Sequence, residues 1–126
     1  MAEKTICDKM LLKPGRSLAV INPPSGYLES LLPLPDFARL ADSPQEADVV
    51  QLFIRTYTEL DEQLPHVKIH LRPSTILWVC FPKQTGKVRT DINGEILYVY
   101  AAQKNWKGNG MFSINSDWSA MRFKPV

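Results

Sequence analysis

Two apolar stretches decide the fold, DVVQLFI at residues 48–54 and LRPSTILWVCFP at residues 71–82, the second of which opens with a turn. Both are rich in β-branched and aromatic side chains and show no polar alternation, which is typical of strands covered on both faces. The segment between them is long enough for the crossover that a parallel pair requires, and apolar residues recur in it at helical spacing. This strand–helix–strand order predicts an α/β fold.

The crossover helix has a clear predicted start and a predicted irregularity. Thr56 and Glu59 match a capping box, in which each side chain satisfies a first-turn amide. Pro65 lies within the apolar pattern and should kink the helix or split it in two. Four further elements precede this unit: a helix at residues 3–12, a strand at 17–21, one or two helical turns at 27–32, and a short edge strand at 37–40.

The remainder of the chain predicts a helix and a hairpin. Residues 91–104 favour a helix, although 96–100 also has the composition of a strand. Residues 111–114 and 118–123 flank a turn-forming segment and predict a C-terminal hairpin. Four side chains of the predicted helix should face the core: Ile92, Ile96, Val99 and Tyr100.

Length and composition limit the classes of function. The chain has 126 residues, which suits a single domain, and its net charge of +2 is too small for a general nucleic-acid or membrane binder. Without a membrane-length apolar run or a signal-peptide pattern, the cytoplasm is the expected location. Cys7 and Cys80 lack a CxxC partner, and His66 and His70 lack a third ligand. We therefore expect no metal site.

The order of elements resembles a trimmed Rossmann-type methyltransferase core, with LRPS at 71–74 in place of that core's proline–glycine turn. More closely, the chain resembles a family of small bacterial proteins that carry only a domain-of-unknown-function label. The resemblance implies one three-layer α/β domain over residues 1–126, with a mostly parallel sheet ending in an antiparallel hairpin. It implies no activity. The matching stretches are LKPG at 12–15, NPPSGY at 22–27, LWV at 77–79 with PK at 82–83, KVRTD at 87–91 and WSAMRF at 118–123.

The methyltransferase resemblance raises the question of S-adenosylmethionine as a cofactor. A working site needs a glycine-rich turn after the first strand and an acidic residue after the second. The turn NPPSG at 22–26 has one glycine and two prolines, which lack N–H donors. Asp42 could supply the acid, but it lies in a poorly patterned segment. We expect no bound cofactor, with S-adenosylmethionine binding as the alternative.

The best candidate site is the basic loop PKQTGKVRTD at residues 82–91. It follows the carboxyl end of a buried strand, where open α/β sheets bind ligands, and it leads into a helix N-terminus that favours anions. The plain alternative is a solvated basic loop in which Thr90 or Asp91 caps the helix. The loop residues predicted to hold a phosphate or carboxylate are Lys83, Thr85, Lys87, Arg89 and Thr90.

The opposite wall of this site is predicted to be Asn22, Ser25 and Tyr27. The expected partner is a small anionic ligand or an acidic protein surface, bound without turnover, with no membrane or nucleic acid involved. One alternative is a methyltransferase with an atypical cofactor turn. Another is a homodimer whose strand 118–123 forms the interface, although a Trp such as Trp118 more often belongs to the core.

Overall fold

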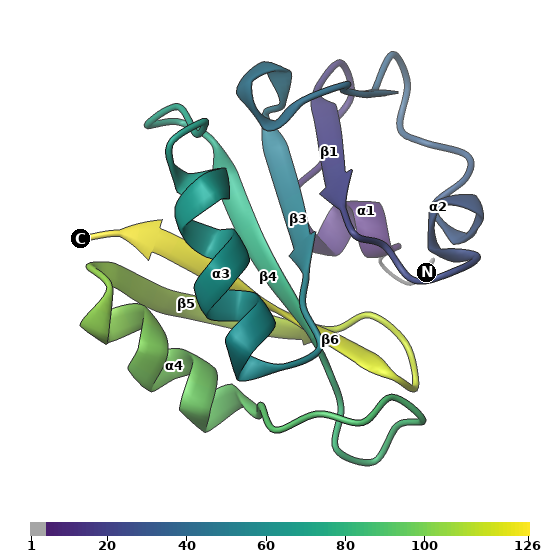
Figure 1. Ribbon diagram of the computed structural model, residues 1–126. Coiled ribbons are helices and arrows are strands. Elements are labelled where there is room, and N and C mark those ends of the chain that lie inside the picture. Colours follow the sequence, from purple (N-terminus) through teal and green to yellow (C-terminus); the bar gives the residue numbers. More distant parts are fainter. Residues whose placement is uncertain (1–4) are drawn as a thin grey trace.

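The computed structural model describes residues 5–126 and contains one six-stranded sheet with the order β2-β1-β3-β4-β6-β5 (Figure 1). The first four of these strands are parallel, whereas β6 runs antiparallel to both β4 and β5. The predicted mostly parallel sheet with a terminal antiparallel hairpin is confirmed. The strands are β1 Ser17–Ile21, β2 Arg39–Leu40, β3 Val49–Phe53, β4 Ile76–Pro82, β5 Trp106–Ser113 and β6 Trp118–Pro125.

Helices cover both faces of the sheet and make the fold three-layered, as predicted. Side chains of α3 and α4 share one core with the sheet, and side chains around α1 and α2 share the other (Figure 1). Among the described residues, none of the helices has the length and apolar character that crossing a bilayer would require. The helices are α1 Ile6–Lys9, α2 Tyr27–Ser30, the 3-10 helix η1 Pro44–Glu46, α3 Tyr57–Lys68 and α4 Gly94–Gln103. Glu3 and Lys4, predicted to start the first helix, lie outside the described residues.

The central strand β3 shows why its sequence lacks polar alternation. All five of its residues are buried. Val50 and Leu52 face the α3 side of the sheet, while Val49 and Phe53 face the α1 side. Because both faces are covered, apolar residues are required at successive positions rather than at every second one.

The crossover helix α3 is one continuous helix, so of the two outcomes predicted for Pro65, a kink or a split, the split is wrong. Pro65 lies in the last turns, and the helix continues past it to Lys68. The Thr56 hydroxyl accepts a hydrogen bond from the Glu59 amide at 3.2 Å, as the capping box predicts. The Glu59 carboxylate, however, lies 3.6 Å from the guanidinium of Arg55.

Helix α4 buries a narrower face than predicted. Leu97, Tyr100 and Ala101 are its buried residues, whereas Ile96 and Val99 have 37% and 50% of their surface exposed. The prediction that these last two face the core is wrong. The buried residues lie at i, i+3 and i+4, which defines one stripe on a helix, and the two exposed residues fall outside it.

The hairpin is longer than predicted, because β5 begins at Trp106, directly after α4, rather than at Met111. Its partner β6 lies in the interior of the sheet, between β4 and β5. Trp118 is buried, and its ring centroid lies 5.2 Å from that of Phe53. Because β6 is paired on both sides within the chain, strand 118–123 offers no free edge to a second copy.

Candidate functional site

Four connecting segments lie at the end of the sheet where the parallel strands finish, which we name the carboxyl edge. In Figure 1 the arrowheads of β1 and β3 point toward this edge, and the loop after β4 and the hairpin tip lie along it. Ligands of open α/β sheets bind at this end. The segments are the turn 22–26 after β1, residues 54–56 after β3, the basic loop 83–91 after β4, and the β5–β6 turn 114–117.

Asp117 of the β5–β6 turn holds the basic loop in place. The Lys83 amide donates to the Asp117 carbonyl at 2.7 Å, and the Lys87 amide donates to the Asp117 carboxylate at 2.9 Å. Between them, Gly86 lies so close that a Cβ there would come within 2.8 Å of the Asp117 Cα. Val88 packs against the sheet. The loop is thus a fixed part of the edge.

The basic loop borders an open hollow of about 360 Å³ lined by Gln84, Gly86, Lys87, Val88, Arg89 and Thr90. The ion pairs found among residues 5–126 do not involve Lys83, Lys87 or Arg89. Within the same part of the chain, the amides of Val88, Arg89 and Thr90 donate no hydrogen bond. Two cationic residues and three residues whose amides donate no hydrogen bond therefore line one small hollow, and both kinds of group can complement an anion.

The other predicted loop residues lie outside the hollow or have local partners. The Lys83 ammonium donates to the Ser113 hydroxyl at 2.5 Å, which directs it toward the hairpin. Thr85 is exposed and does not line the hollow. The Thr90 hydroxyl accepts from the Ile92 amide at 3.0 Å and so forms a local turn.

Helix α4 is capped by neither Thr90 nor Asp91. Its N-cap is Asn93, whose side chain accepts from the Ile96 amide at 2.8 Å. The Asp91 carboxylate instead accepts from the Tyr57 amide at 2.8 Å, in the first turn of α3. Asp91 therefore fastens the end of the basic loop to a different helix.

The turn after β1 contributes less to an open site than predicted. Tyr27 is 3% exposed, with its ring 4.7 Å from that of Phe53 and its hydroxyl donating to the Gln51 side chain at 2.6 Å. Burial raises the pKa of Tyr27 well above its ordinary value. The prediction that Tyr27 lines a ligand wall is wrong, because α2 turns it into the core. Ser25 is exposed, and the Asn22 amide donates to the side chain of Gln63 on α3.

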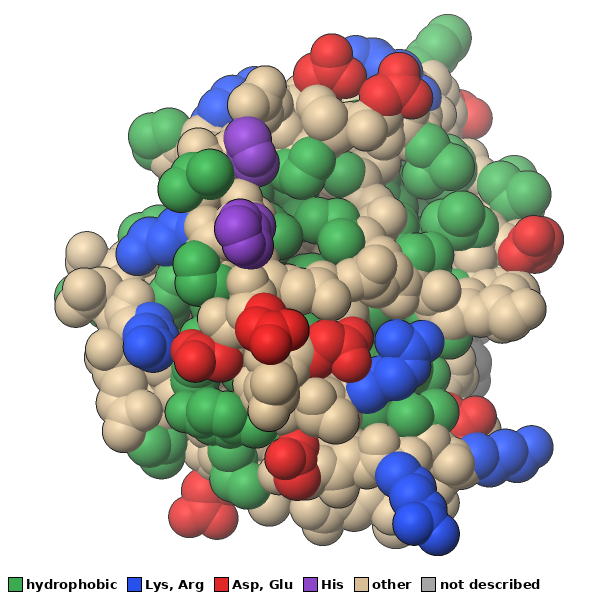
Figure 2. All heavy atoms as spheres, in the orientation of Figure 1, with side chains coloured by type: hydrophobic (Ala, Val, Ile, Leu, Met, Phe, Trp, Pro, Cys, Tyr) green, Lys and Arg blue, Asp and Glu red, His purple; other side chains and the backbone are tan. Residues whose placement is uncertain are grey.

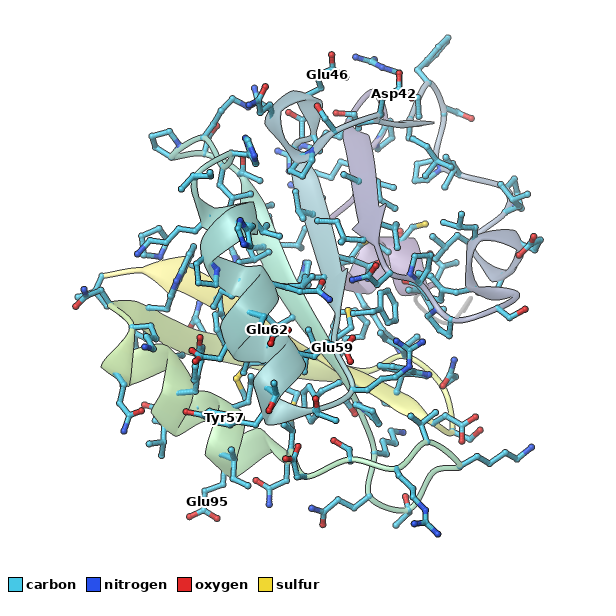
Figure 3. All side chains as sticks on the ribbon, in the orientation of Figure 1. Asp42, Glu46, Tyr57, Glu59, Glu62 and Glu95 are labelled. Carbon is cyan, nitrogen blue, oxygen red and sulfur yellow. The ribbon has the colours of Figure 1, made fainter. Side chains whose placement is uncertain are left out.

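The residues do not fit S-adenosylmethionine bound in the usual Rossmann manner. Figure 3 places Asp42 beside Glu46 at the upper end of the sheet, opposite the carboxyl edge. The Glu46 carbonyl accepts from the hydroxyl of Ser17, the first residue of β1, at 2.9 Å, which identifies that end as the start of the strands. Asp42 therefore cannot hold a ribose at the carboxyl edge. Pro23 and Pro24 also remove two backbone donors from the turn after β1.

Sequence reasoning missed two residues of the carboxyl edge, Arg55 and Asp117. Arg55 lies in the segment that follows β3, and its guanidinium lies 5.8 Å from the centroid of the Trp118 ring. Its position after a buried strand was the available signal. Asp117 had no such signal, because only the tertiary structure brings the hairpin turn against the basic loop.

Comparisons with known proteins place the fold among methyltransferases. No protein-family model matches the chain, and no curated protein matches it in sequence. It is similar to the tRNA methyltransferase TrmK of B. subtilis, with 12% identity, a TM-score of 0.56, and coverage of 89% of this chain and 61% of that one. It is also similar to the ribosomal protein L11 methylase of Lactobacillus delbrueckii subsp. bulgaricus, with 13% identity and a TM-score of 0.53. That match covers 94% of this chain and 73% of the other. A third similar structure is an uncharacterized protein of Listeria monocytogenes serotype 4b, with 13% identity and a TM-score of 0.55. That match covers 99% of this chain and 69% of the other.

At these identities the similarity establishes a methyltransferase-like fold. The chain spans about three fifths of the length of TrmK.

Proposed function

We propose that the protein binds a small anionic ligand, phosphorylated or carboxylated, at its carboxyl edge through the basic loop. The observation that carries this proposal is the hollow where Lys87 and Arg89 meet the free amides of residues 88–90. An acidic side chain on a protein surface presents the same chemical group and is the alternative source of the anion.

Three physical features support the proposal. Hydrogen bonds from cations and amides to an oxyanion are charge-assisted and stronger than neutral ones. The loop is anchored by Asp117 before any ligand arrives, so less conformational entropy is lost on binding. The cations are solvent-accessible, and we therefore expect the affinity to fall with increasing salt.

Calorimetry and thermal-shift measurements with inorganic phosphate, sulfate and nucleotides test the proposal. The double variant Lys87→Ala/Arg89→Ala should weaken binding at least about tenfold. The matched control is Lys107→Ala/Lys124→Ala, which removes the same charge from a register pair at the opposite end of the hairpin. Absence of binding by the wild-type protein, or equal losses in both double variants, would refute the proposal.

Methyl transfer is the second candidate function, because two solved structures with a similar fold are methylases. In this case S-adenosylmethionine would bind through an atypical turn at residues 22–26. Calorimetry with S-adenosylmethionine separates the two candidates. Gly26 has a φ of +83°, so Gly26→Val should distort this turn and abolish methyl-donor binding. Binding of phosphate at the basic loop should persist in the same variant.

A further inference from the structure

The number of hydrogen-bond donors around the hollow of the basic loop is the feature that selects among anions. Within residues 5–126 the amides of Val88, Arg89 and Thr90 donate no hydrogen bond, and the side chains of Lys87 and Arg89 add further donors. A carboxylate presents two oxygen atoms in one plane, whereas a phosphate monoester presents three acceptor oxygens. This set of donors matches the larger group better.

The buried contact of Val88 sets the position of the two cations beside it. The Val88 side chain packs against the core around α1 and α2, while Lys87 and Arg89 are both exposed and both line the hollow. Figure 2 shows Lys and Arg side chains projecting at the lower right, where Figure 1 places the loop after β4. One ligand can therefore meet both cations.

The walls of the hollow offer little apolar surface. Among the six described residues that line it, Val88 is the only apolar one. Sites for organic molecules are mostly apolar, with a few polar groups that fix the orientation of the ligand. The hollow is instead suited to a charged group that is recognised by its oxygens, with the organic part of the ligand left outside.

Two carboxylates near the loop oppose any anion. Asp117 accepts from the Lys87 amide at 2.9 Å, and Asp91 accepts from the Tyr57 amide at 2.8 Å. Doubling the charge of the ligand doubles its attraction to the cations and its repulsion from these carboxylates alike. The additional charge-assisted hydrogen bonds therefore decide between the anions, and they favour the group with more acceptor oxygens.

We infer that the ligand of the carboxyl edge is a phosphate monoester in its doubly charged form. The inference rests on the proposed function, which leaves phosphate and carboxylate open. The phosphate can belong to a free small molecule or to a phosphorylated side chain, because both present the same group. A phosphodiester fits less well, since it has only one charge and carries a second substituent.

Calorimetry with methyl phosphate, dimethyl phosphate and acetate tests the choice of ligand. Methyl phosphate should bind at least about tenfold more tightly than either of the others. Equal or tighter binding of acetate would overturn the inference and leave anion binding in place, whereas failure of all three probes and of sulfate to bind would refute both proposals. A phosphoserine tripeptide distinguishes the sources. An affinity like that of methyl phosphate indicates a free monoester, and an affinity at least about tenfold higher indicates a phosphorylated protein.

The pH dependence of binding gives a second readout. A phosphate monoester loses its second proton at about pH 6, so the affinity for methyl phosphate should rise from about pH 5 and level off above about pH 7. Sulfate keeps both charges over this range and should show a flat profile. It controls for the charged groups of the protein around the loop, which act on both probes: Lys83, Lys87, Arg89, Asp91 and Asp117. Parallel profiles for the two probes would overturn the inference.

Amide chemical shifts in isotope-labelled protein locate the bound phosphate. The amides of Val88, Arg89 and Thr90 should shift on titration with methyl phosphate. Arg89→Lys keeps the charge but replaces a planar fork of donors with one ammonium group, so it should weaken binding at least about threefold. The matched control is Arg39→Lys at the start of β2, which pairs with Ser17 at the opposite end of the parallel strands. Binding that leaves the three amides unshifted, or equal affinities of the two variants, would overturn the inference.

Discussion

At the scale of single residues, the contact between Tyr27 and Gln51 explains how a short helix stays attached to the sheet. Gln51 is fully buried on the central strand β3 and accepts the Tyr27 hydroxyl at 2.6 Å. Its side-chain nitrogen donates no hydrogen bond within residues 5–126. A buried polar group is costly unless it is paired, so Tyr27 is the contact that makes Gln51 tolerable at this position.

This contact leads to a prediction for a double-mutant cycle. Tyr27→Phe should destabilise the protein by about 1–3 kcal/mol, because it leaves the buried Gln51 amide with no partner. Adding Gln51→Leu should recover much of that loss, since both members are then apolar. Urea denaturation of the wild-type protein, both single variants and the double variant measures the coupling. Strictly additive losses would show that the hydrogen bond carries no such role.

At the scale of elements, the close packing of the basic loop against the hairpin depends on Gly86. Gly86→Ala puts a Cβ within 2.8 Å of the Asp117 backbone, which cannot move aside as a flexible side chain can. We expect the loop to shift, with a loss of about 1–3 kcal/mol in stability and faster hydrogen exchange at the Lys87 amide. Anion binding should weaken as well.

The control for this element is Gly94→Ala. Its added Cβ would meet only the flexible side chain of Met111, at 3.4 Å. Because alanine also favours the helix, this variant should keep its stability and the slow exchange of the Lys87 amide. Equal behaviour of the two variants would contradict a fixed loop.

At the scale of the whole molecule, Asp48 ties together the ends of three segments. Its carboxylate accepts from the Ser17 amide at 3.0 Å at the start of β1, and from Arg72 at 3.3 Å in the turn before β4. The Ser17 amide bond is the largest cause of the lowered pKa of Asp48, and the Arg72 guanidinium adds to it. Asp48 itself precedes β3, so this contact holds β1, β3 and the approach to β4 in register.

The lowered pKa predicts acid sensitivity. The folded state binds the Asp48 proton less tightly than the unfolded state does, so the carboxylate stabilises the fold above its unfolded pKa of about 3.9. That contribution is lost as the pH falls through the folded pKa. Asp48→Asn should therefore be less stable than wild type near neutral pH, and the difference should shrink in acid. Urea melts from about pH 7 to about pH 3 measure it, and a constant difference would contradict the role of the charge.

Most of the sheet was predictable from local sequence. The apolar runs of β1, β3 and β4 identified the parallel strands, because both faces of such strands must be apolar. Residues 115–117 predicted the hairpin turn. The wrong prediction for Ile96 and Val99 came from a segment without periodicity. Because residues 96–100 are apolar throughout, their sequence does not show which side of α4 faces the sheet.

The candidate site was only partly predictable. Sequence placed the basic loop after β4, since the loop directly follows a recognisable strand. It could not show that Tyr27 turns inward to Gln51, or that Asp117 meets the Lys87 amide. Those contacts join residues 24 and 30 positions apart.

The sequence by itself determined the order and type of the main elements, the parallel strands with their closing hairpin, and a cationic loop at a strand end. Periodicity, capping and turn chemistry depend on near neighbours in the chain. Only the tertiary structure decided that Asp42 lies at the far end of the sheet and that Val99 faces outward. Packing between distant segments sets both features. It decides where the connection that carries Asp42 lies, and it decides which side of a uniformly apolar helix is buried.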